Sequence, residues 1–125
     1  MMTLTQMRHT KLWFAGAAGN WPLAAYEIAE LKEGFDEIIA FHPTHDDVSI
    51  DELLPQMMAD PLEHLDGAIA AKDSVRFIAA FNALTAGCNS CHQAAAFALN
   101  VVTRPTTNPY SNQNFATPGT REAAH

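Results

Sequence analysis

Basic side chains and long apolar runs are both scarce in this sequence. Its 125 residues include 7 lysines and arginines against 14 acidic residues, which gives a formal net charge of −7. Nucleic acid is therefore not an expected partner, because phosphate contacts need clustered lysine and arginine. No apolar run approaches the roughly 18 residues of a membrane span, so we expect no transmembrane segment.

Catalytic and targeting signatures are missing as well. There is no Ser/His/Asp order and no phosphate-cradling glycine loop, and Glu63-His64 lacks the spacing of a zinc hydrolase motif. The chain is therefore not expected to be an enzyme. It also begins without the charged segment and apolar stretch that mark a signal peptide.

Strand-like alternation is nearly absent, whereas apolar residues recur at the three- and four-residue steps of amphipathic helices. The length and the 48% content of apolar residues fit a single domain over residues 1–125. We predict an all-α fold, a four-helix bundle over about residues 3–99. An extended C-terminal tail rich in proline and asparagine is expected to follow over about residues 100–125.

Start and stop signals give the helix bounds. Asn20 before Trp21-Pro22 and Asp73 have the form of N-caps, and the segment from Ser49 to Glu52 has the form of a capping box. Pro55 and Asp60-Pro61 predict a short piece followed by a separate helix. The predicted helices therefore cover about residues 3–16, 20–42, 49–72 and 73–95, with a polar loop at 44–48.

The acidic side chains concentrate on the second predicted helix. We expect most of this run to be a solvated helix face that attracts a basic protein partner. Its members are Glu27, Glu30, Glu33, Asp36 and Glu37.

The most informative motif is the C-x-x-C-H sequence from Cys88 to His92, which uses both cysteines of the chain. This spacing is typical of covalent haem attachment. Each thiol of Cys88 and Cys91 can add to one vinyl group of the porphyrin, and the adjacent His92 can then reach the iron as an axial ligand.

Other interpretations of the cysteine pair stay open at this point. A redox-active dithiol would need a strand before the motif, and here the motif lies inside a helical pattern. A zinc site needs further ligands, which without a third cysteine would have to come from histidines such as His9, His42 or His64. Two structural thiols are the remaining alternative.

Four helical segments with C-x-x-C-H in the last one resemble the class II c-type cytochromes, which are cytochrome c prime-like four-helix bundles. Residues 11–16 and 20–24 are also similar to those of small exported monohaem c-type cytochromes, which would form a related branch. The resemblance implies one covalently attached haem c, with Cys88 and Cys91 as attachment points and His92 as the proximal iron ligand. Because such attachment takes place outside the bacterial cytoplasm, it also implies a periplasmic protein in its mature form.

The resemblance places the first helix on the distal side of the haem. Met7 and His9 are therefore the candidate sixth ligands, although a step of two residues turns a helix by about 200 degrees, so both cannot face the iron. Trp13 is expected as a wall residue beside the porphyrin, and Tyr110 and Phe115 as tail anchors near the haem edge.

Two functions follow from the resemblance. Six-coordinate iron implies periplasmic electron transfer with a basic redox partner protein. Five-coordinate iron implies binding of small gases such as nitric oxide or carbon monoxide, in a dry pocket lined by Leu4, Leu12 and Phe14. Bundles of this type in many cases pair through their first two helices, so the resemblance also allows a homodimer.

Overall fold

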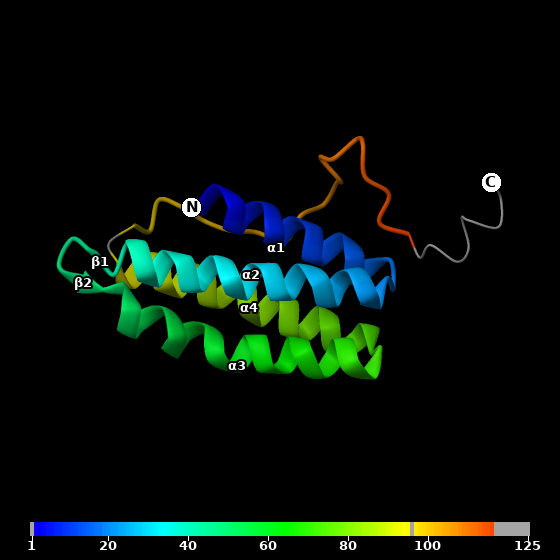
Figure 1. Ribbon diagram of the computed structural model, residues 1–125, viewed down its shortest axis with the longest axis horizontal. Coiled ribbons are helices and arrows are strands. Elements are labelled where there is room, and N and C mark those ends of the chain that lie inside the picture. The colour runs from blue at the N-terminus through cyan, green and yellow to red at the C-terminus, as the bar shows by residue number, and fades with distance from the viewer. Residues whose placement is uncertain (1, 96, 117–125) are drawn as a thin grey trace.

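Four helices lie side by side along one axis in the computed structural model, which describes residues 2–95 and 97–116 (Figure 1). The described part of the chain also holds a two-stranded hairpin. The prediction of an all-α fold is confirmed, while the predicted tail beyond residue 116 lies outside the described residues. The helices run alternately up and down, and their bounds are α1 Met2–Ala17, α2 Trp21–Phe41, α3 Ile50–Ala71 and α4 Ser74–Ala94.

Side-chain caps begin two of the helices as the sequence predicts. The Asn20 side chain accepts a hydrogen bond from the Leu23 backbone N–H, and the Asp73 side chain accepts one from the Arg76 backbone N–H. Each bond satisfies one of the backbone donors that a helix start leaves unpaired. Helix α2 ends before Pro43, since the residue preceding a proline is driven out of helical dihedrals.

Helix α3 is continuous, so the predicted division at Pro55 and Pro61 is wrong. Pro61 has no N–H to offer the carbonyl of Met57. That carbonyl is instead closely approached by α4, where a Cβ added at Gly87 would lie 3.0 Å from the Met57 oxygen. Helix α4 therefore packs closely against α3 at the position where the hydrogen bonding of α3 is interrupted.

The start of α3 also differs from the prediction. Ser49 stands at the N-cap, but its side chain makes no capping hydrogen bond. The Pro43 carbonyl accepts from the backbone N–H groups of Ile50 and Asp51 at 2.8 and 3.2 Å. The predicted capping box is therefore wrong, because a carbonyl from the end of α2 already satisfies the first free donors of α3.

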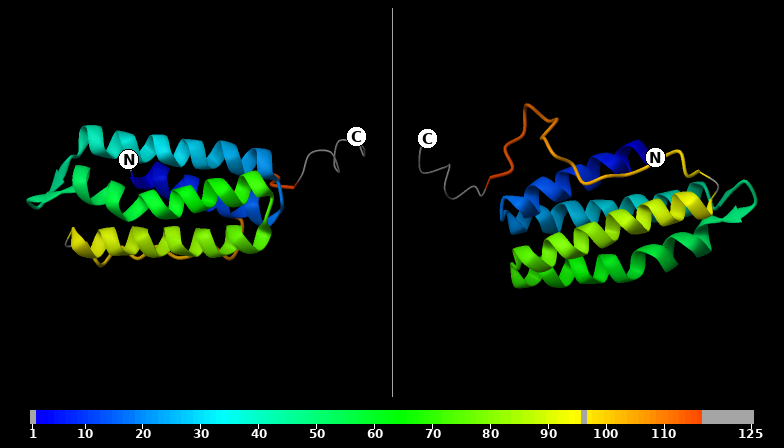
Figure 2. Two further views of the ribbon diagram at one scale, coloured as in Figure 1. Left: turned by 90° about the horizontal axis from the view of Figure 1, so that it is seen from below. Right: turned by 180° about the vertical axis from the view of Figure 1, so that it is seen from behind.

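A hairpin occupies the segment that the sequence predicted as a polar loop. Strands β1 (Thr44–His45) and β2 (Val48–Ser49) pair antiparallel across Asp46 and Asp47. Both aspartates have positive φ, 47° and 66°, the pattern of a tight two-residue hairpin turn that aspartate tolerates better than most residues. The hairpin extends beyond the bundle at the end where α2 finishes and α3 begins (Figure 2).

Aromatic side chains fill the interior between α1 and α4. Phe77 and Phe81 are fully buried, with Trp13 packed against both rings. Gly16 lets α1 approach this cluster, since a Cβ at that position would lie 2.0 Å from the Phe77 ring. None of the helices that the structure describes is long and apolar enough to cross a membrane.

Residues 97–116 return along the bundle from the end of α4 to the corner between α1 and α2 (Figure 2). Lys11 lies over the Tyr110 ring, with 4.8 Å between its nitrogen and the ring centroid. Phe115 is buried against Phe14, and its carbonyl accepts from the Asn20 side chain. Tyr110 and Phe115 therefore anchor the tail on the bundle as predicted. The predicted position of Phe115 near a haem edge is wrong, because Phe115 packs at the end of the bundle opposite the C-x-x-C-H motif.

Candidate functional site

The C-x-x-C-H residues occupy the last turns of α4, next to a cavity of about 330 Å³. Cys91 and His92 are buried and Cys88 is half-buried. Besides these three, the cavity walls are mostly apolar and come from α2, α3, the hairpin and the tail. They consist of Phe35, Ile38, His42, Thr44, His45, Ile50, Leu54, Ala95, Phe97 and Asn100.

A second cavity, of about 390 Å³, adjoins the first, since Cys88, His92, Phe97 and Asn100 line both. Its α1 wall is polar, and its other walls come from Leu31 of α2 and from the tail. The α1 and tail residues that line it are Thr3, Thr5, Gln6, His9, Thr10, Val101, Val102 and Thr103.

The apolar lining predicted for the α1 side of the site is wrong. Leu12 is fully buried in the core, Phe14 packs on Phe115, and Leu4 is 57% exposed. None of the three lines either cavity. Helix α1 instead contributes hydroxyl, amide and imidazole groups to the wall of the second cavity, so this wall is polar.

One hydrogen bond fixes the proton on the His92 ring. Its Nδ1 lies 2.7 Å from the Asn100 carbonyl oxygen. A carbonyl can only accept, so Nδ1 carries a hydrogen, and the neutral form of the ring has its lone pair on Nε2. Metal-binding histidines usually have this arrangement, in which one ring nitrogen donates to a carbonyl and the other is free to bind.

The two thiols are held in their protonated form. Burial raises the pKa of Cys88 to about 12, with the neighbouring Cys91 adding to the shift. Burial also raises the pKa of Cys91. Redox-active dithiols work through a cysteine whose pKa is lowered by a positive neighbour or a helix N-terminus. Here the cysteines lie near a helix C-terminus and their pKa values are raised. The raised pKa values argue against the dithiol interpretation.

His9 is buried on α1 and lines the second cavity together with Cys88 and His92. Its Nε2 lies 2.8 Å from the Thr85 hydroxyl oxygen, and that hydroxyl donates its one hydrogen to the Phe81 carbonyl. The hydroxyl must therefore accept from His9, which puts the imidazole proton on Nε2. Burial lowers the pKa of His9 to about 4, so the ring is neutral near pH 7.

Met7 and Trp13 are not brought to the motif. Met7 is half-buried and lines neither cavity. Trp13 packs on Phe77 and Phe81, and Arg104 of the tail lies over its ring at 4.7 Å. Of the candidates on α1, the structure thus brings His9 alone to the cavity walls shared with His92.

The histidines considered for a zinc site are spread over the molecule. His42 lines the first cavity at the end of α2, His9 lines the second, and His64 is exposed on α3. Within residues 2–95 and 97–116, no three side chains of histidine, cysteine, aspartate or glutamate lie close enough together to hold a metal ion. Cys88, Cys91 and His92 therefore do not form a three-donor metal site in the described part of the chain.

Asn89, inside the motif, is a site residue that the sequence analysis missed. Its side chain donates to the Val102 carbonyl at 2.8 Å and accepts from the Val102 backbone N–H at 2.7 Å. The helical spacing holds a signal, because residues three apart lie on the same side of a helix and Asn89 precedes His92 by three. The tail segment that Asn89 binds, at Val102, gave no signal of its own.

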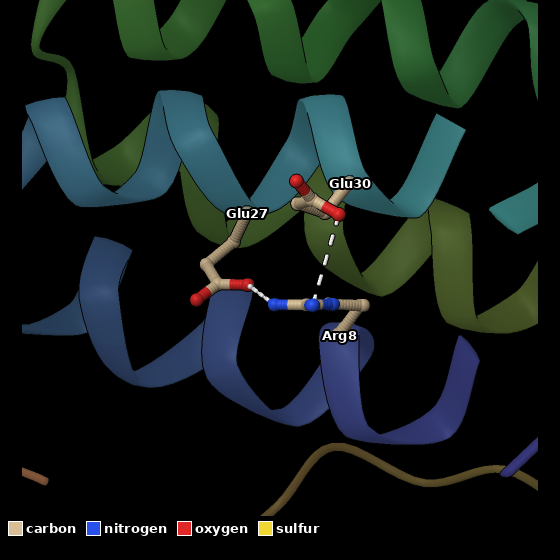
Figure 3. A network of polar contacts seen from close by, with 3 residues as sticks. All are labelled: Arg8, Glu27 and Glu30. Atoms are coloured by element: carbon tan, nitrogen blue, oxygen red, sulfur yellow. Dashed lines mark hydrogen bonds and ion pairs between the residues drawn. The ribbon is translucent and has the colours of Figure 1, made fainter. Parts of the chain in front are cut away.

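Part of the predicted acidic face of α2 is buried. Arg8 of α1 forms ion pairs with Glu27 at 3.1 Å and with Glu30 at 3.7 Å, and the Glu27 side chain is 2% exposed (Figure 3). Desolvation lowers the Arg8 pKa, but the hydrogen bond and charge of Glu27 outweigh it, so the net shift is upward. Glu27 thus joins α1 to α2, while Glu33, Asp36 and Glu37 are exposed as predicted.

Comparisons with protein-family models, with curated proteins and with solved structures found no match. The chemistry of the residues around His92 therefore carries the functional conclusion. Those residues offer two neutral thiols, an oriented imidazole, an apolar cavity and a polar one.

Proposed function

We propose that this protein is a monohaem c-type cytochrome of the class II kind that carries electrons in the bacterial periplasm. The observation that carries the proposal is the His92 ring, whose Nδ1–H is bound to the Asn100 carbonyl and whose Nε2 lone pair is free. It stands beside two cysteines at the spacing that covalent haem attachment requires.

The residues around the motif fit a porphyrin. Cys88 and Cys91 would hold it through thioether bonds, and His92 would bind the iron through Nε2. Phe35, Ile38 and other apolar side chains offer a wall that excludes water from a largely apolar ring. The haem, when bound, supplies a one-electron couple, and the chain supplies its ligands, its orientation and its dry surroundings.

His9 is the better candidate for the sixth ligand, because it lines a cavity with His92 whereas Met7 lines none. Its lowered pKa keeps the ring neutral, which ligation requires. Binding through Nε2 would require His9 to release the Thr85 hydroxyl. Iron held by two imidazoles changes oxidation state with little rearrangement, which suits electron transfer.

A second function, binding of small gases to five-coordinate iron, is favoured by the hydrogen bond between His9 and Thr85. While Thr85 engages Nε2 of His9, that nitrogen cannot serve as a ligand. The adjoining cavity of about 390 Å³ would then leave room for a diatomic ligand next to His92. Its polar wall would donate hydrogen bonds to such a ligand, in contrast to a dry pocket.

The surface charge supports a basic redox partner. Glu33, Asp36 and Glu37 are exposed on α2, and the chain has a formal net charge of −7. Opposite charge on a partner speeds encounter at low ionic strength, and the gain falls as salt screens it. An association rate that decreases with added salt is therefore expected.

Production of the full chain with haem-attachment machinery tests the proposal. We expect a Soret band and a protein mass increased by the mass of one haem. The mass increase should persist after acidic organic extraction. Cys88→Ala and Cys91→Ala should each weaken covalent retention, and the double variant should abolish it. Ser90→Ala, which keeps both thiols, is the matched control. Wild-type protein matured in this way with free thiols and no haem would overturn the proposal.

Carbon monoxide separates the two functions. With His9 on the iron, the reduced protein should show no spectral change on addition of the gas, and His9→Ala should create one. Met7→Leu should leave the spectrum as in the wild type. A strong shift in the wild type, unchanged by His9→Ala, would instead establish the gas-binding function.

A further inference from the structure

The segment that supplies the Asn100 carbonyl is held by hydrogen bonds and hardly at all by burial. Leu99 and Val101, which flank Asn100, are 82% and 67% exposed. These two side chains therefore add little apolar contact to hold this part of the tail. Hydrogen bonds hold it instead. The backbone N–H groups of Phe97 and Asn100 donate to the carbonyls of His92 and Phe97, and Val102 pairs with the Asn89 side chain.

The side-chain amide of Asn89 pairs with Val102 as a peptide group of a neighbouring strand would. It accepts from the Val102 N–H at 2.7 Å and donates to the Val102 carbonyl at 2.8 Å. Val102 follows Asn100 by two residues, as Asn89 precedes His92 by three. Side-chain hydrogen bonds thus connect the last turns of α4 to the tail at two places, through the double hydrogen bond of Asn89 with Val102 and the single one of His92 with Asn100.

We propose that Asn89 is a positioning residue for His92, because its double hydrogen bond to Val102 holds the Asn100 carbonyl against the His92 Nδ1–H. The tail is thereby part of the proximal site, and it sets the direction and the donor strength of the imidazole. The part of this inference that concerns iron rests on the proposed haem function. The part that concerns the His92 proton does not.

Contacts further along the tail support the same role. Arg104 lies over the Trp13 ring at 4.7 Å, and Phe115 is buried at the far end of the bundle. These contacts bring the tail back to α1, but they begin beyond Val102. Asn89 is the motif side chain that holds the tail just after Asn100, and it lies about one helical turn before His92.

The first test uses the full chain without haem. Nitrogen NMR of the imidazole rings in alkaline buffer reports which His92 nitrogen carries the proton, and amide hydrogen exchange reports the protection of the Val102 N–H. Asn89→Ala should raise the share of the Nε2–H form and increase Val102 exchange by tenfold or more. Ser90→Ala, in the same motif but exposed, should match the wild type in both measurements.

A second variant breaks the hydrogen bonds between Asn89 and Val102 from the side of the tail. Val102→Pro removes the backbone N–H while leaving the Asn89 side chain intact. It should shift the His92 proton in the same direction as Asn89→Ala. The two variants alter different elements, so agreement between them reports on the shared hydrogen-bonded pair and not on a general loss of structure at either position.

The second test uses the haem-loaded protein. A hydrogen bond from Nδ1 makes the imidazole more basic and favours ferric iron. Loss of this bond in Asn89→Ala should weaken the preference for ferric iron by about tenfold. For a one-electron couple this is a rise of about 59 mV in reduction potential. Ser90→Ala should leave the potential unchanged, and covalent haem content should be equal in the two variants.

The outcomes are distinguishable. If Asn89→Ala and Val102→Pro leave the His92 proton and the reduction potential as in the wild type, the positioning role is overturned while the cytochrome proposal stands. If no haem is attached but the His92 proton shifts in the haem-free chain, the cytochrome proposal fails and the positioning of His92 by Asn89 is upheld.

Discussion

Acidification should destabilise the haem-free chain through His9. Burial lowers the pKa of this imidazole from 6.5 to about 4, because the charged ring would lose its hydration. The unfolded chain therefore takes up a proton at pH values where the folded chain does not. The stability that the neutral ring provides is complete above pH 6.5 and is lost as pH falls from there toward the folded pKa of about 4.

The size of the effect follows from the two pKa values. His9 is 4% exposed, so solvent screening reduces the effect little. A shift of one pKa unit corresponds to about 1.4 kcal/mol, which makes the total loss roughly 3 kcal/mol once the pH is below both values. Most of it should appear early, with about 2 kcal/mol lost between about pH 7 and about pH 5.

Urea unfolding of the wild type and of His9→Gln at these two pH values measures the loss. Glutamine does not titrate, so the variant should lose about 2 kcal/mol less than the wild type on acidification. His64→Gln, at an exposed position on α3, should follow the wild type. Carboxylates titrate in all three proteins and cancel from the comparison. Equal losses in His9→Gln and the wild type would refute the reasoning.

Three further outcomes follow from packing and charge. Arg8→Ala leaves a buried carboxylate without its partner and should cost about 3–5 kcal/mol in urea unfolding, whereas Lys32→Ala, at an exposed ion pair, should cost no more than about 1. Gly87→Ala would put a Cβ 2.6 Å from a methionine side chain and should cost about 1–3 kcal/mol, while Gly34→Ala meets ordinary contact distances and should be neutral or stabilising. The Cys88 pKa of about 12 against an ordinary 9.0 should slow alkylation of the haem-free chain by roughly a thousandfold relative to a free thiol, as followed by mass spectrometry; a rate near that of a model thiol would contradict the burial described for it.

The helices could be predicted from local signals because the residues that begin and end them act locally. Asn20 and Asp73 cap the helices that follow them through bonds spanning three residues. Periodicity of apolar residues added the faces that pack together. These signals depend on near neighbours in the chain, so they can be recognised from the sequence alone.

The errors at α3 have the opposite cause. Pro61 interrupts a hydrogen bond, and by local rules it should end or divide a helix. The contact of α4 with the freed Met57 carbonyl, and the Pro43 carbonyl that replaces the Ser49 cap, both come from other elements. No local pattern encodes these contacts, so the sequence could indicate only that something unusual occurs there.

At the candidate site, the sequence identified the motif but not its surroundings. Cys88, Cys91 and His92 share a helix, so their spacing alone brings them together. The Asn100 carbonyl is a main-chain group that any residue could supply, and its approach to His92 depends on the path of the tail. Whether His9 or Met7 lines the cavity shared with His92 likewise depends on how α1 is rotated against α4, which composition does not reveal.

The glycine one residue before the first cysteine has a consequence for how the motif is held. At Gly87 the missing side chain of α4 leaves a gap beside the Met58 side chain and the Met57 carbonyl of α3. Sliding α4 along its neighbour by a single residue would force Ala86 or Cys88 into that gap. Packing at Gly87 thus fixes the register of the two helices immediately beside the thiols. The fold of the polypeptide itself therefore sets the direction in which the thiols point.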